Sequence, residues 1–301
     1  MPLPNTPGVD VVGRIYRVDT ETNKKYGWKV GDRIVSLVKW GGNSRYLSLD
    51  PSHAIAAPET IDPAMAVCVV ETYLSAFQVL HMGQASHLRY CDDSLSGKSI
   101  LLRGLSVSSM SHAIAQLATI ADAFNVFAVA KDKHFNYLSS LGITPLKNDG
   151  KDWLKSMAGK IDLIISCDDD MITIPYKLLK GSGNVISLKK FGRSSKSTNT
   201  DSKASMMKTG LNFRKRLSRI PRNRTSVYDV YEQWDDDLDL CKRDIQFLLQ
   251  LLEDKKIDPT ILDRISLNKV DDAHDLIRSK RLSGYIVCEP WLVGKSRTIC
   301  L

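Results

Sequence analysis

The alternation of apolar and polar residues is clearest over residues 98–142, where it predicts a strand, a helix and a second strand in succession. Ser99–Arg103 is a short apolar run that Gly104 closes. Ser111–Ala123 then repeats apolar residues at helical spacing, and Asn125–Ala130 is a second short apolar run. A strand, helix and strand in this order are typical of one half of a dinucleotide-binding fold.

The regions on either side of this unit have different patterns. Residues 1–60 combine short alternating runs with glycine turns, which is typical of β structure. Residues 63–81 carry apolar side chains at helical spacing, with Asp62 as the expected N-cap and Pro63 at the first helical position. Downstream, helices alternate with strands, which indicates a parallel sheet. The further expected helices are 134–141, 151–157, 172–179, 239–254 and 270–279, and the further expected strands are 161–166, 184–188, 261–267 and 285–288.

Composition narrows the class of protein without identifying a chemistry. The 301 residues correspond to about two domains at roughly 150 residues each, and 43% of them are hydrophobic. No apolar run approaches the ~18 residues of a membrane span, and the N-terminus does not resemble a signal peptide. The scattered cysteines include no C-x-x-C pair, which argues against a structural zinc site and favours a reducing compartment, here the cytoplasm. The cysteines are residues 68, 91, 167, 241, 288 and 300.

The net charge of +8 comes from one stretch of the chain. Residues 189–224, called the basic stretch below, hold twelve Lys/Arg and one acid, Asp201, so they carry +11 and the remainder carries −3. The simplest interpretation is a solvated surface loop. An acidic membrane surface or an acidic partner is the alternative. Nucleic acid is disfavoured, because no aromatic-interleaved or zinc-finger pattern accompanies the charge.

The turn after Ser99–Arg103 lacks the glycines that a dinucleotide-binding fold usually has there. Glycine is needed because the backbone must approach the pyrophosphate closely with a positive φ, and a side chain costs about 1 kcal/mol of strain. Serine hydroxyls and the N-terminus of the following helix could still hold a phosphate, so retained and lost binding are both open. The candidate cofactor contacts of this turn are Gly104, Ser106, Ser108 and Ser109.

A family resemblance is carried by ordered blocks of sequence. Pro7–Gly13 matches P-G-x-D-x-x-G, Val30–Val35 matches V-G-D-R-V, and Gly41–Gly42 with Tyr46 matches G-G-x-x-x-Y. Over residues 7–291 the chain resembles the medium-chain dehydrogenase/reductase superfamily, in its zinc-independent, quinone-oxidoreductase-like and enoyl-reductase-type branch. The other matching blocks are 72–76, 116–118, 141–142, 162–165, 256–259, 270–274 and 284–287.

The resemblance implies an α/β fold, in which a Rossmann-type doubly wound parallel sheet is joined to a partial β-rich GroES-like domain. The implied domains are a partial GroES-like catalytic domain (1–80), a Rossmann-like cofactor domain with the basic stretch (81–256), and a return to the catalytic domain (257–301). The family's catalytic domain normally begins well before its P-G-x-D block, whereas Met1 stands six residues ahead of Pro7. A fragment, a mis-started gene model and a true truncation all fit this difference.

The activity implied by the resemblance is a zinc-independent, NADPH-dependent reduction of a quinone or an α,β-unsaturated carbonyl by hydride transfer. The implied cleft residues are Tyr46, Thr72 and Tyr73, and for each a structural role is the alternative. Lys131 and Lys133 follow the second strand, where an NAD-specific fold has an acid, so they favour the 2′-phosphate of NADPH. Ordinary exposed lysines are the alternative. No catalytic residue is identified, because no Ser-His-Asp order, carboxylate dyad or metal cluster emerges.

Departures from the family pattern favour a rival hypothesis, a catalytically degenerate member that acts as a binding or membrane-associated scaffold. Asp168–Asp170 stands where relatives have a glycine-containing loop near the nicotinamide ribose, and three carboxylates there would repel a pyrophosphate. Cys167 lies at the expected edge of the sheet, and its simplest interpretation is a buried, unreactive thiol. His112 could approach a phosphate when protonated, or could be an ordinary helix residue. Candidate partners are the carbonyl or quinone substrate, a second copy of the chain in a homodimer, and an acidic surface for the basic stretch.

Overall fold

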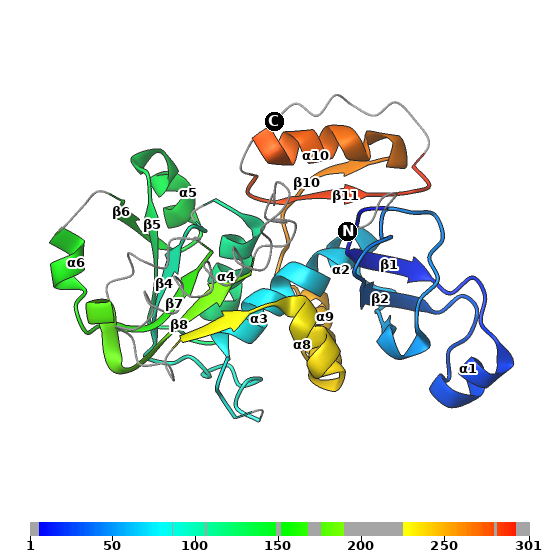
Figure 1. Ribbon diagram of the computed structural model, residues 1–301, viewed down its shortest axis with the longest axis horizontal. Coiled ribbons are helices and arrows are strands. Elements are labelled where there is room, and N and C mark those ends of the chain that lie inside the picture. The colour runs from blue at the N-terminus through cyan, green and yellow to red at the C-terminus, as the bar shows by residue number, and fades with distance from the viewer. Residues whose placement is uncertain are drawn as a thin grey trace, which may run out of the picture. The chain divides into compact units, whose positions relative to one another are not determined.

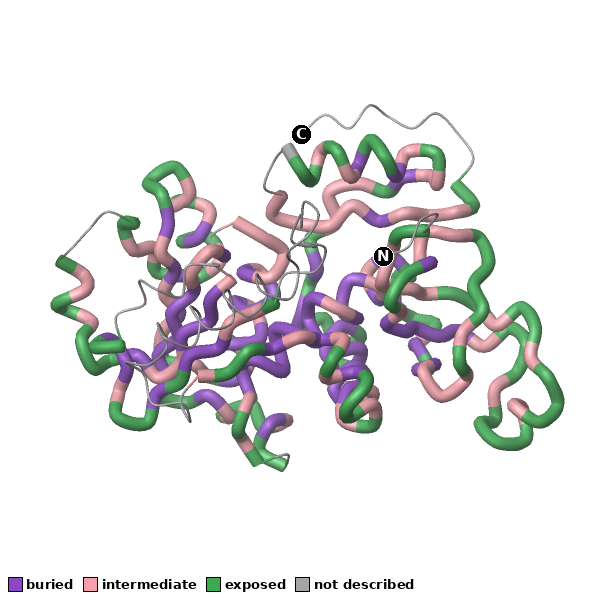
Figure 2. Tube along the Cα trace, in the orientation of Figure 1, coloured by how far each residue is buried: buried purple, intermediate pink, exposed green. Residues whose placement is uncertain are grey.

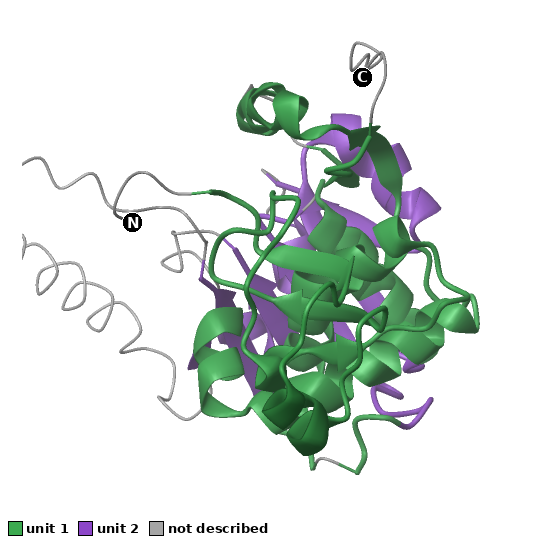
Figure 3. Cartoon of the chain, turned by 90° about the vertical axis from the view of Figure 1, so that its right-hand side faces the viewer, with its two compact units in different colours: residues 1–90, 107–120, 230–301 green, residues 91–106, 121–229 purple. Residues whose placement is uncertain are grey.

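The computed structural model divides the chain into two compact units, each built from separate stretches of sequence (Figure 1, Figure 3). Unit 1 comprises residues 1–90, 107–120 and 230–301, and unit 2 comprises residues 91–106 and 121–229. These bounds differ from the three domains expected above, which stay a prediction. The structure describes residues 6–85, 87–105, 107–148, 152–167, 176–189, 225–279 and 282–292.

A six-stranded parallel sheet forms the centre of unit 2, as the alternating pattern predicts. β4 (Ser99–Arg103) pairs with β5 (Asn125–Ala130) on one side and with β7 (Ile161–Ser166) on the other. The middle of β4 is fully buried, because a central parallel strand is covered on both faces (Figure 2). The outer strands are β6 (Thr144–Lys147), β8 (Leu179–Leu188) and β9 (Thr225–Tyr228).

The order of these strands in space is β6-β5-β4-β7-β8-β9. Numbered along the chain from β4, this order is 3-2-1-4-5-6, the arrangement of dinucleotide-binding sheets. The strand order changes direction between β4 and β7, which makes this the topological switch point of the sheet. Ligands of such sheets bind there, beyond the carboxyl ends of the strands. The fold class expected from the sequence is therefore confirmed.

Two expectations for the elements of unit 2 need correction. Leu179 does not end a helix: a short 3₁₀ helix, Tyr176–Leu178, precedes it and β8 begins at Leu179, while residues 172–175 lie outside the described part. β6 and β9 were not expected, because β6 is a four-residue strand interrupted by Pro145 and β9 directly follows the basic stretch. The helices α5 (Phe135–Ser140) and α6 (Asp152–Ser156) lie within their expected ranges.

Unit 1 contains a small antiparallel sheet, as expected for its β-rich start. β1 (Asp10–Arg14) pairs with β2 (Arg33–Leu37), and β2 pairs with β3 (Ile55–Ala56). Between β1 and β2 the chain forms α1 (Thr20–Tyr26), a short helix without buried residues that the apolar pattern could not indicate. The Asp19 carboxylate caps it by accepting a hydrogen bond from the Thr22 N–H.

Backbone hydrogen bonds join two of the matching sequence blocks, Pro7–Gly13 and the Gly41–Gly42 turn. The Gly42 N–H donates to the Gly8 carbonyl at 3.0 Å, and the Asn43 N–H donates to the Pro7 carbonyl at 2.9 Å. Gly8 has φ +94°, and a Cβ there would stand 2.4 Å from the Asn43 nitrogen. Only glycine fits this approach, so the P-G-x-D and G-G-x-x-x-Y blocks form one backbone-paired structure.

The longest helical stretch of unit 1 runs from α2 (Pro63–Cys68) through a five-residue π-helical turn (Val69–Tyr73) into α3 (Leu74–Leu80). Asp62 caps it as predicted, with its carboxylate accepting from the Ala64 N–H. In the described part of the chain, residues 63–80 alone form a helix long and apolar enough to cross a membrane, but 78% of them are buried inside the protein. That burial is typical of a core helix, so the stretch is weak support for a membrane span.

The remaining elements of unit 1 pack around this stretch. α4 and α9 both contact α3 and the π-helical turn, and β10 pairs with β11 in parallel. The apolar face expected on α9 is buried. The bounds are α4 (Ser109–Ile120), α8 (Val230–Asp236), α9 (Leu238–Glu253), β10 (Ile261–Ile265), α10 (Val270–Ser279) and β11 (Tyr285–Cys288).

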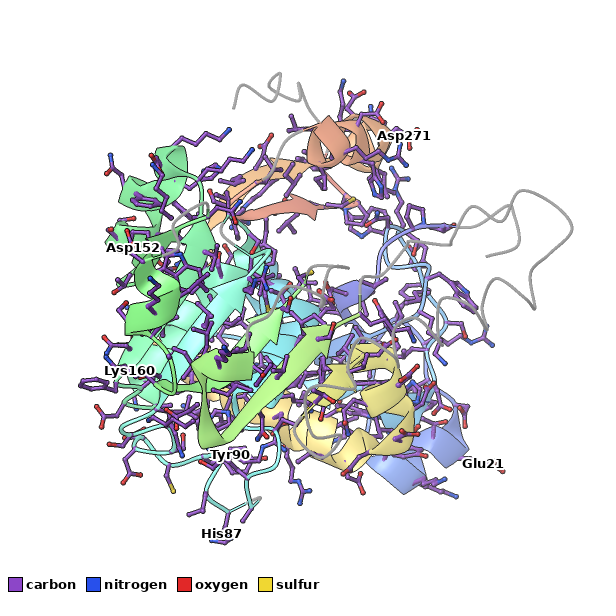
Figure 4. The ribbon with its side chains drawn as sticks, turned by 60° about the vertical axis from the view of Figure 1, so that its left-hand side comes forward. Glu21, His87, Tyr90, Asp152, Lys160 and Asp271 are labelled. Atoms are coloured by element: carbon purple, nitrogen blue, oxygen red, sulfur yellow. The ribbon has the colours of Figure 1, made fainter. Side chains whose placement is uncertain are left out.

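A buried polar network joins α3 and α9 to the connection after α3. The Asp244 carboxylate on α9 has no exposed surface; it pairs with the Arg89 guanidinium at 3.0 Å and accepts from the Gln78 amide at 2.8 Å and the Tyr90 hydroxyl at 2.8 Å (Figure 4 labels Tyr90). Burial raises the pKa of Asp244, and the Arg89 charge opposes that rise. The network fixes residues 89 and 90, in a connection whose sequence predicts only polar loop.

Candidate functional site

The turn after β4 has one glycine in the conformation that a cofactor turn needs. Gly104 has φ +70°, in the left-handed region that favours glycine. Ser106 lies outside the described residues. The Ser108 hydroxyl accepts a hydrogen bond from the Ser111 N–H at 3.1 Å, so Ser108 caps the N-terminus of α4. Ser109 is the first residue of α4. The phosphate-binding role of these four residues stays a prediction.

Beyond β5, the structure leaves positive charge where the resemblance places the cofactor ribose. Lys131 and Lys133 are exposed, and neither forms an ion pair within the described part of the chain. The intervening Asp132 pairs with Lys147 at 3.2 Å, so the nearest acid is already neutralised by a neighbour. The preference of Lys131 and Lys133 for the 2′-phosphate of NADPH stays a prediction.

The residues after β7 are placed only in part. Cys167 is half-buried, and its N–H donates to the Arg103 carbonyl at 3.0 Å, which extends the pairing of β7 with β4 by one residue. Asp168–Asp170 lies outside the described residues. The repulsion expected from these three carboxylates therefore stays a hypothesis.

The π-helical turn Val69–Tyr73 holds the two cleft residues that the resemblance implies in the helical stretch. π-helical turns are rare and occur often at functional sites. Thr72 is buried, and its hydroxyl donates to the Glu71 carboxylate at 3.1 Å. Tyr73 is fully buried, and its hydroxyl donates to the Gln116 Oε1 atom at 2.7 Å. Tyr73 thus ties the π-helical turn to α4, and its role beside a cofactor stays a prediction.

The hydrogen bonds of Gln116 determine the protonation of His112. Gln116 Oε1 accepts from Tyr73 and from the Asp258 N–H, so its Nε2 is the donor towards the Asp258 carbonyl and the His112 Nε2 atom at 3.1 Å. His112 Nε2 must then accept, which leaves the proton on Nδ1, 3.2 Å from the Thr260 hydroxyl. Burial lowers the pKa of His112 in agreement with this neutral form. The ring is engaged within unit 1, which argues against a protonated phosphate ligand.

Asp10 on β1 and Glu71 on the π-helical turn form a carboxyl pair that sequence analysis did not find. Burial, and next the Glu71 charge, raise the pKa of Asp10 well above its ordinary value. Burial also raises the pKa of Glu71, against the hydrogen bond from Thr72. The Asp10 Oδ1 atom is buried and accepts no hydrogen bond from the described residues. A nearby negative charge disfavours the ionised form of a carboxyl group, which agrees with the raised pKa of Asp10 beside Glu71.

Weakly acidic and neutral groups surround this pair. The Cys68 thiol on α2 and the Tyr285 hydroxyl on β11 both have pKa values raised by burial, and both stay protonated. The Arg264 guanidinium on β10 is already paired with Asp62 and Glu289. The described residues contain no group of three or more His, Cys, Asp or Glu placed to hold a metal ion. Sequence analysis could not reveal the Asp10–Glu71 pair, because its members are far apart in the chain.

Tyr46, the third cleft residue implied by the resemblance, lies elsewhere in unit 1. Its side chain is 62% exposed and does not pack into the apolar core. Its ring contacts Tyr16 at a centroid distance of 5.3 Å and Trp291 at 5.5 Å. A role for Tyr46 in a substrate cleft stays a prediction.

Comparison with known proteins finds relatives of this chain at low sequence identity. No family model matches it. It is 24% identical over 300 residues to the synaptic vesicle membrane protein VAT-1 homolog of Rattus norvegicus, covering 96% of this chain and 70% of that one. It is 23% identical over 299 residues to the chloroplast envelope quinone oxidoreductase homolog of Arabidopsis thaliana, covering 96% and 80%.

Solved structures show the same fold. The quinone oxidoreductase of Pseudomonas syringae pv. Tomato DC3000 superposes with a TM-score of 0.73 at 15% identity, over 96% of this chain and 83% of that one. Enoyl reductases are also among the structures with this fold. The resemblance of the chain to the zinc-independent, quinone-oxidoreductase-like branch of the medium-chain dehydrogenase/reductase superfamily is confirmed.

Proposed function

We propose that this protein is an NADPH-dependent oxidoreductase that reduces quinones or α,β-unsaturated carbonyls without zinc. The observation that carries the proposal is the parallel sheet of unit 2, whose 3-2-1-4-5-6 strand order is that of dinucleotide-binding domains. Relatives named as quinone oxidoreductases and solved enoyl reductases with this fold support an oxidoreductase. A cytoplasmic location is part of the same proposal.

The residues present fit a dinucleotide at three points. Gly104 has no side chain to obstruct the backbone after β4, and its φ is positive. The twelve-residue α4 starts a few residues later in the sequence, and a helix N-terminus favours an anion such as a pyrophosphate. Lys131 and Lys133 supply the positive charge that a 2′-phosphate needs. When bound, the nicotinamide supplies the hydride, and the protein binds and orients it.

Reduction of these substrates also consumes a proton. The Asp10–Glu71 pair is the candidate source of that proton in this proposal, because burial raises the pKa of both carboxyl groups. Glu71 is adjacent in sequence to Thr72 and Tyr73, the residues that the family resemblance places beside the nicotinamide.

Fluorescence titration of the full chain with NADPH and NADH tests the cofactor. We expect NADPH to bind at least about tenfold more tightly, and we expect Lys131→Ala to remove most of that preference. Lys160→Ala is the matched control, because Lys160 is also an exposed lysine of unit 2 (labelled in Figure 4). Equal affinities for both cofactors, or equal effects of the two substitutions, would contradict the NADPH assignment.

A scaffold without catalysis is the second candidate function, favoured by the scarcity of glycine between Gly104 and α4. A site with side chains at those positions holds the pyrophosphate poorly. The same titration separates the two functions, since a scaffold gives no saturable signal with either cofactor. Saturable NADPH binding with turnover of a simple quinone would reject the scaffold.

A further inference from the structure

Three loops of unit 1 bring aromatic rings together on its surface. Tyr16 lies between β1 and α1, Tyr46 lies in the loop after β2, and Trp291 follows β11. Tyr46 contacts both other rings, at centroid distances of 5.3 and 5.5 Å. The Arg45 guanidinium stacks over the Trp291 ring at 5.0 Å, and its Nε donates to the Pro290 carbonyl at 3.3 Å. These residues are called the aromatic cluster below.

The aromatic cluster is exposed, although its rings contact one another. The exposed fractions are 75% for Tyr16, 62% for Tyr46 and 58% for Trp291. Leu47 and Leu292, next to cluster members in sequence, are exposed as well. Contacts between segments so distant in sequence form only in the folded protein, so the fold assembles this surface. Contiguous exposed apolar surface of this kind marks an interaction site in soluble proteins.

The charges around the aromatic cluster favour an anionic partner. Segments 14–32, 38–50 and 289–292, which supply the cluster and its flanks, contain seven Lys/Arg and five Asp/Glu, and of the seven, Arg14 pairs with Glu59 and Lys39 pairs with Asp235. The carboxylates nearest the rings in sequence have other partners: Asp19 caps α1, and Glu289 pairs with Arg264. The charged side chain that stacks on a ring is the Arg45 guanidinium. The rings are thus accompanied by a cation.

The residue types of the aromatic cluster and their position in loops favour a lipid membrane over a protein as the partner. Trp and Tyr concentrate at the membrane–water interface, where the ring is buried and the polar atom stays hydrated, and Arg binds anionic head groups. A protein partner often pairs with a strand edge or packs on a helix face, but Tyr16, Tyr46 and Trp291 all lie outside the helices and strands of the described chain. Loop tips that carry rings and exposed leucines suit shallow insertion instead.

We propose that the aromatic cluster docks the protein reversibly on an anionic lipid membrane through Tyr16, Tyr46 and Trp291, with Arg45 contacting a phosphate of the head groups. This surface would hold the protein at the place where hydrophobic quinones and enones concentrate. The proposal stands on the cluster alone and does not require that the cofactor binds.

Vesicle co-sedimentation of the full chain tests the proposal. We use vesicles of phosphatidylcholine, with or without about one-third phosphatidylserine. The wild-type chain should sediment with the anionic vesicles and bind the neutral ones more weakly. The double variant Tyr46→Ser/Trp291→Ser should lose about tenfold or more in partition, because two interfacial rings are removed. Arg45→Gln should weaken binding to anionic vesicles and leave the weaker neutral binding unchanged.

Phe124→Ser is the matched control, because Phe124 is 70% exposed but belongs to unit 2. It should sediment like the wild type, and circular dichroism should show that all variants are folded. The proposal is overturned if wild type stays in the supernatant with both vesicles, or if Phe124→Ser loses as much binding as the double variant. A concentration-dependent dimer that the double variant abolishes, without vesicle binding by the wild type, would instead assign the surface to a second copy of the chain.

Discussion

The parallel sheet of unit 2 and the helical stretch 63–80 of unit 1 are both buried, but they enclose different kinds of group. β4 buries aliphatic side chains on both faces, with Leu101 at its centre. The helical stretch and its neighbours bury hydrogen-bonded groups such as Tyr73 and Asp244, and they include the half-buried Glu71 carboxyl, whose pKa is raised. The contribution of the sheet to the free energy of unfolding should therefore depend little on pH. The contribution of the helical region should change with pH as its carboxyl groups titrate.

Leu101→Ala should give the largest effect, because it opens a cavity in the middle of the sheet. We expect a loss of about 3–5 kcal/mol in the free energy of unfolding, equal at about pH 5 and about pH 8. Urea denaturation at the two pH values measures it. Leu88→Ala, at an exposed leucine, should cost about 0.5 kcal/mol or less. A strongly pH-dependent loss for Leu101→Ala would contradict the comparison.

Arg89→Met should cost about 3 kcal/mol near neutral pH, because it leaves the buried Asp244 carboxylate without its cation. The penalty should shrink towards acid pH, where Asp244 is protonated and needs no cation. The same denaturation series checks this. Arg243→Met is the control, since Arg243 is an exposed neighbour of Asp244 on α9. If the Arg89→Met penalty is the same at both pH values, Asp244 is not the ionised partner of Arg89 in this network.

Glu71→Gln should increase stability at high pH relative to the wild type. The pKa of Glu71 is raised in the folded state, so above its ordinary value the unfolded chain releases a proton that the folded chain keeps. Wild-type stability therefore falls as pH rises, by about 1.4 kcal/mol for each unit of pKa difference. Glutamine keeps an acceptor for Thr72 but does not titrate, so its advantage should grow from about pH 4 upward. A difference independent of pH would refute the carboxyl pair.

Glycine in the turn after β4 should strengthen NADPH binding. Replacing Ser106 and Ser109 with glycine relieves the side-chain obstruction while Ser108 still caps α4. We expect a gain of about 1 kcal/mol, roughly fivefold in affinity. Adding Ser108→Gly should bring a further gain in binding and cost only a few tenths of a kcal/mol in stability. Weaker binding by the double variant would mean that the serine hydroxyls themselves hold the phosphate.

The fold could be predicted from the sequence wherever hydrophobic pattern determines structure. The runs at 99–103 and 125–130 gave their strands because central parallel strands need continuous apolar residues. β6 escaped prediction because Pro145 interrupts a run of only four residues, and α1 escaped because it buries nothing. An apolar periodicity arises where an element packs against a core, and neither β6 nor α1 buries enough side chains to produce one.

The candidate site was predicted less completely than the fold. Family blocks indicated Thr72 and Tyr73, but no local pattern marks a π-helical turn, which differs from an α-helix only in the spacing of its hydrogen bonds. The Asp10–Glu71 pair joins residues from β1 and the helical stretch, so it exists only after folding. The Asp244 network depends in the same way on Arg89 and Tyr90, which belong to a segment predicted as polar loop.

The parallel pairing of β8 with β9 places a constraint on the basic stretch between them. In a parallel pair the chain leaves the carboxyl end of one strand and must return to the amino end of the next, so the connection has to travel back along the sheet. A parallel crossover needs about a dozen residues, whereas 36 residues separate Leu188 at the end of β8 from Thr225 at the start of β9. The connection between these two strands is therefore about three times as long as their parallel pairing requires.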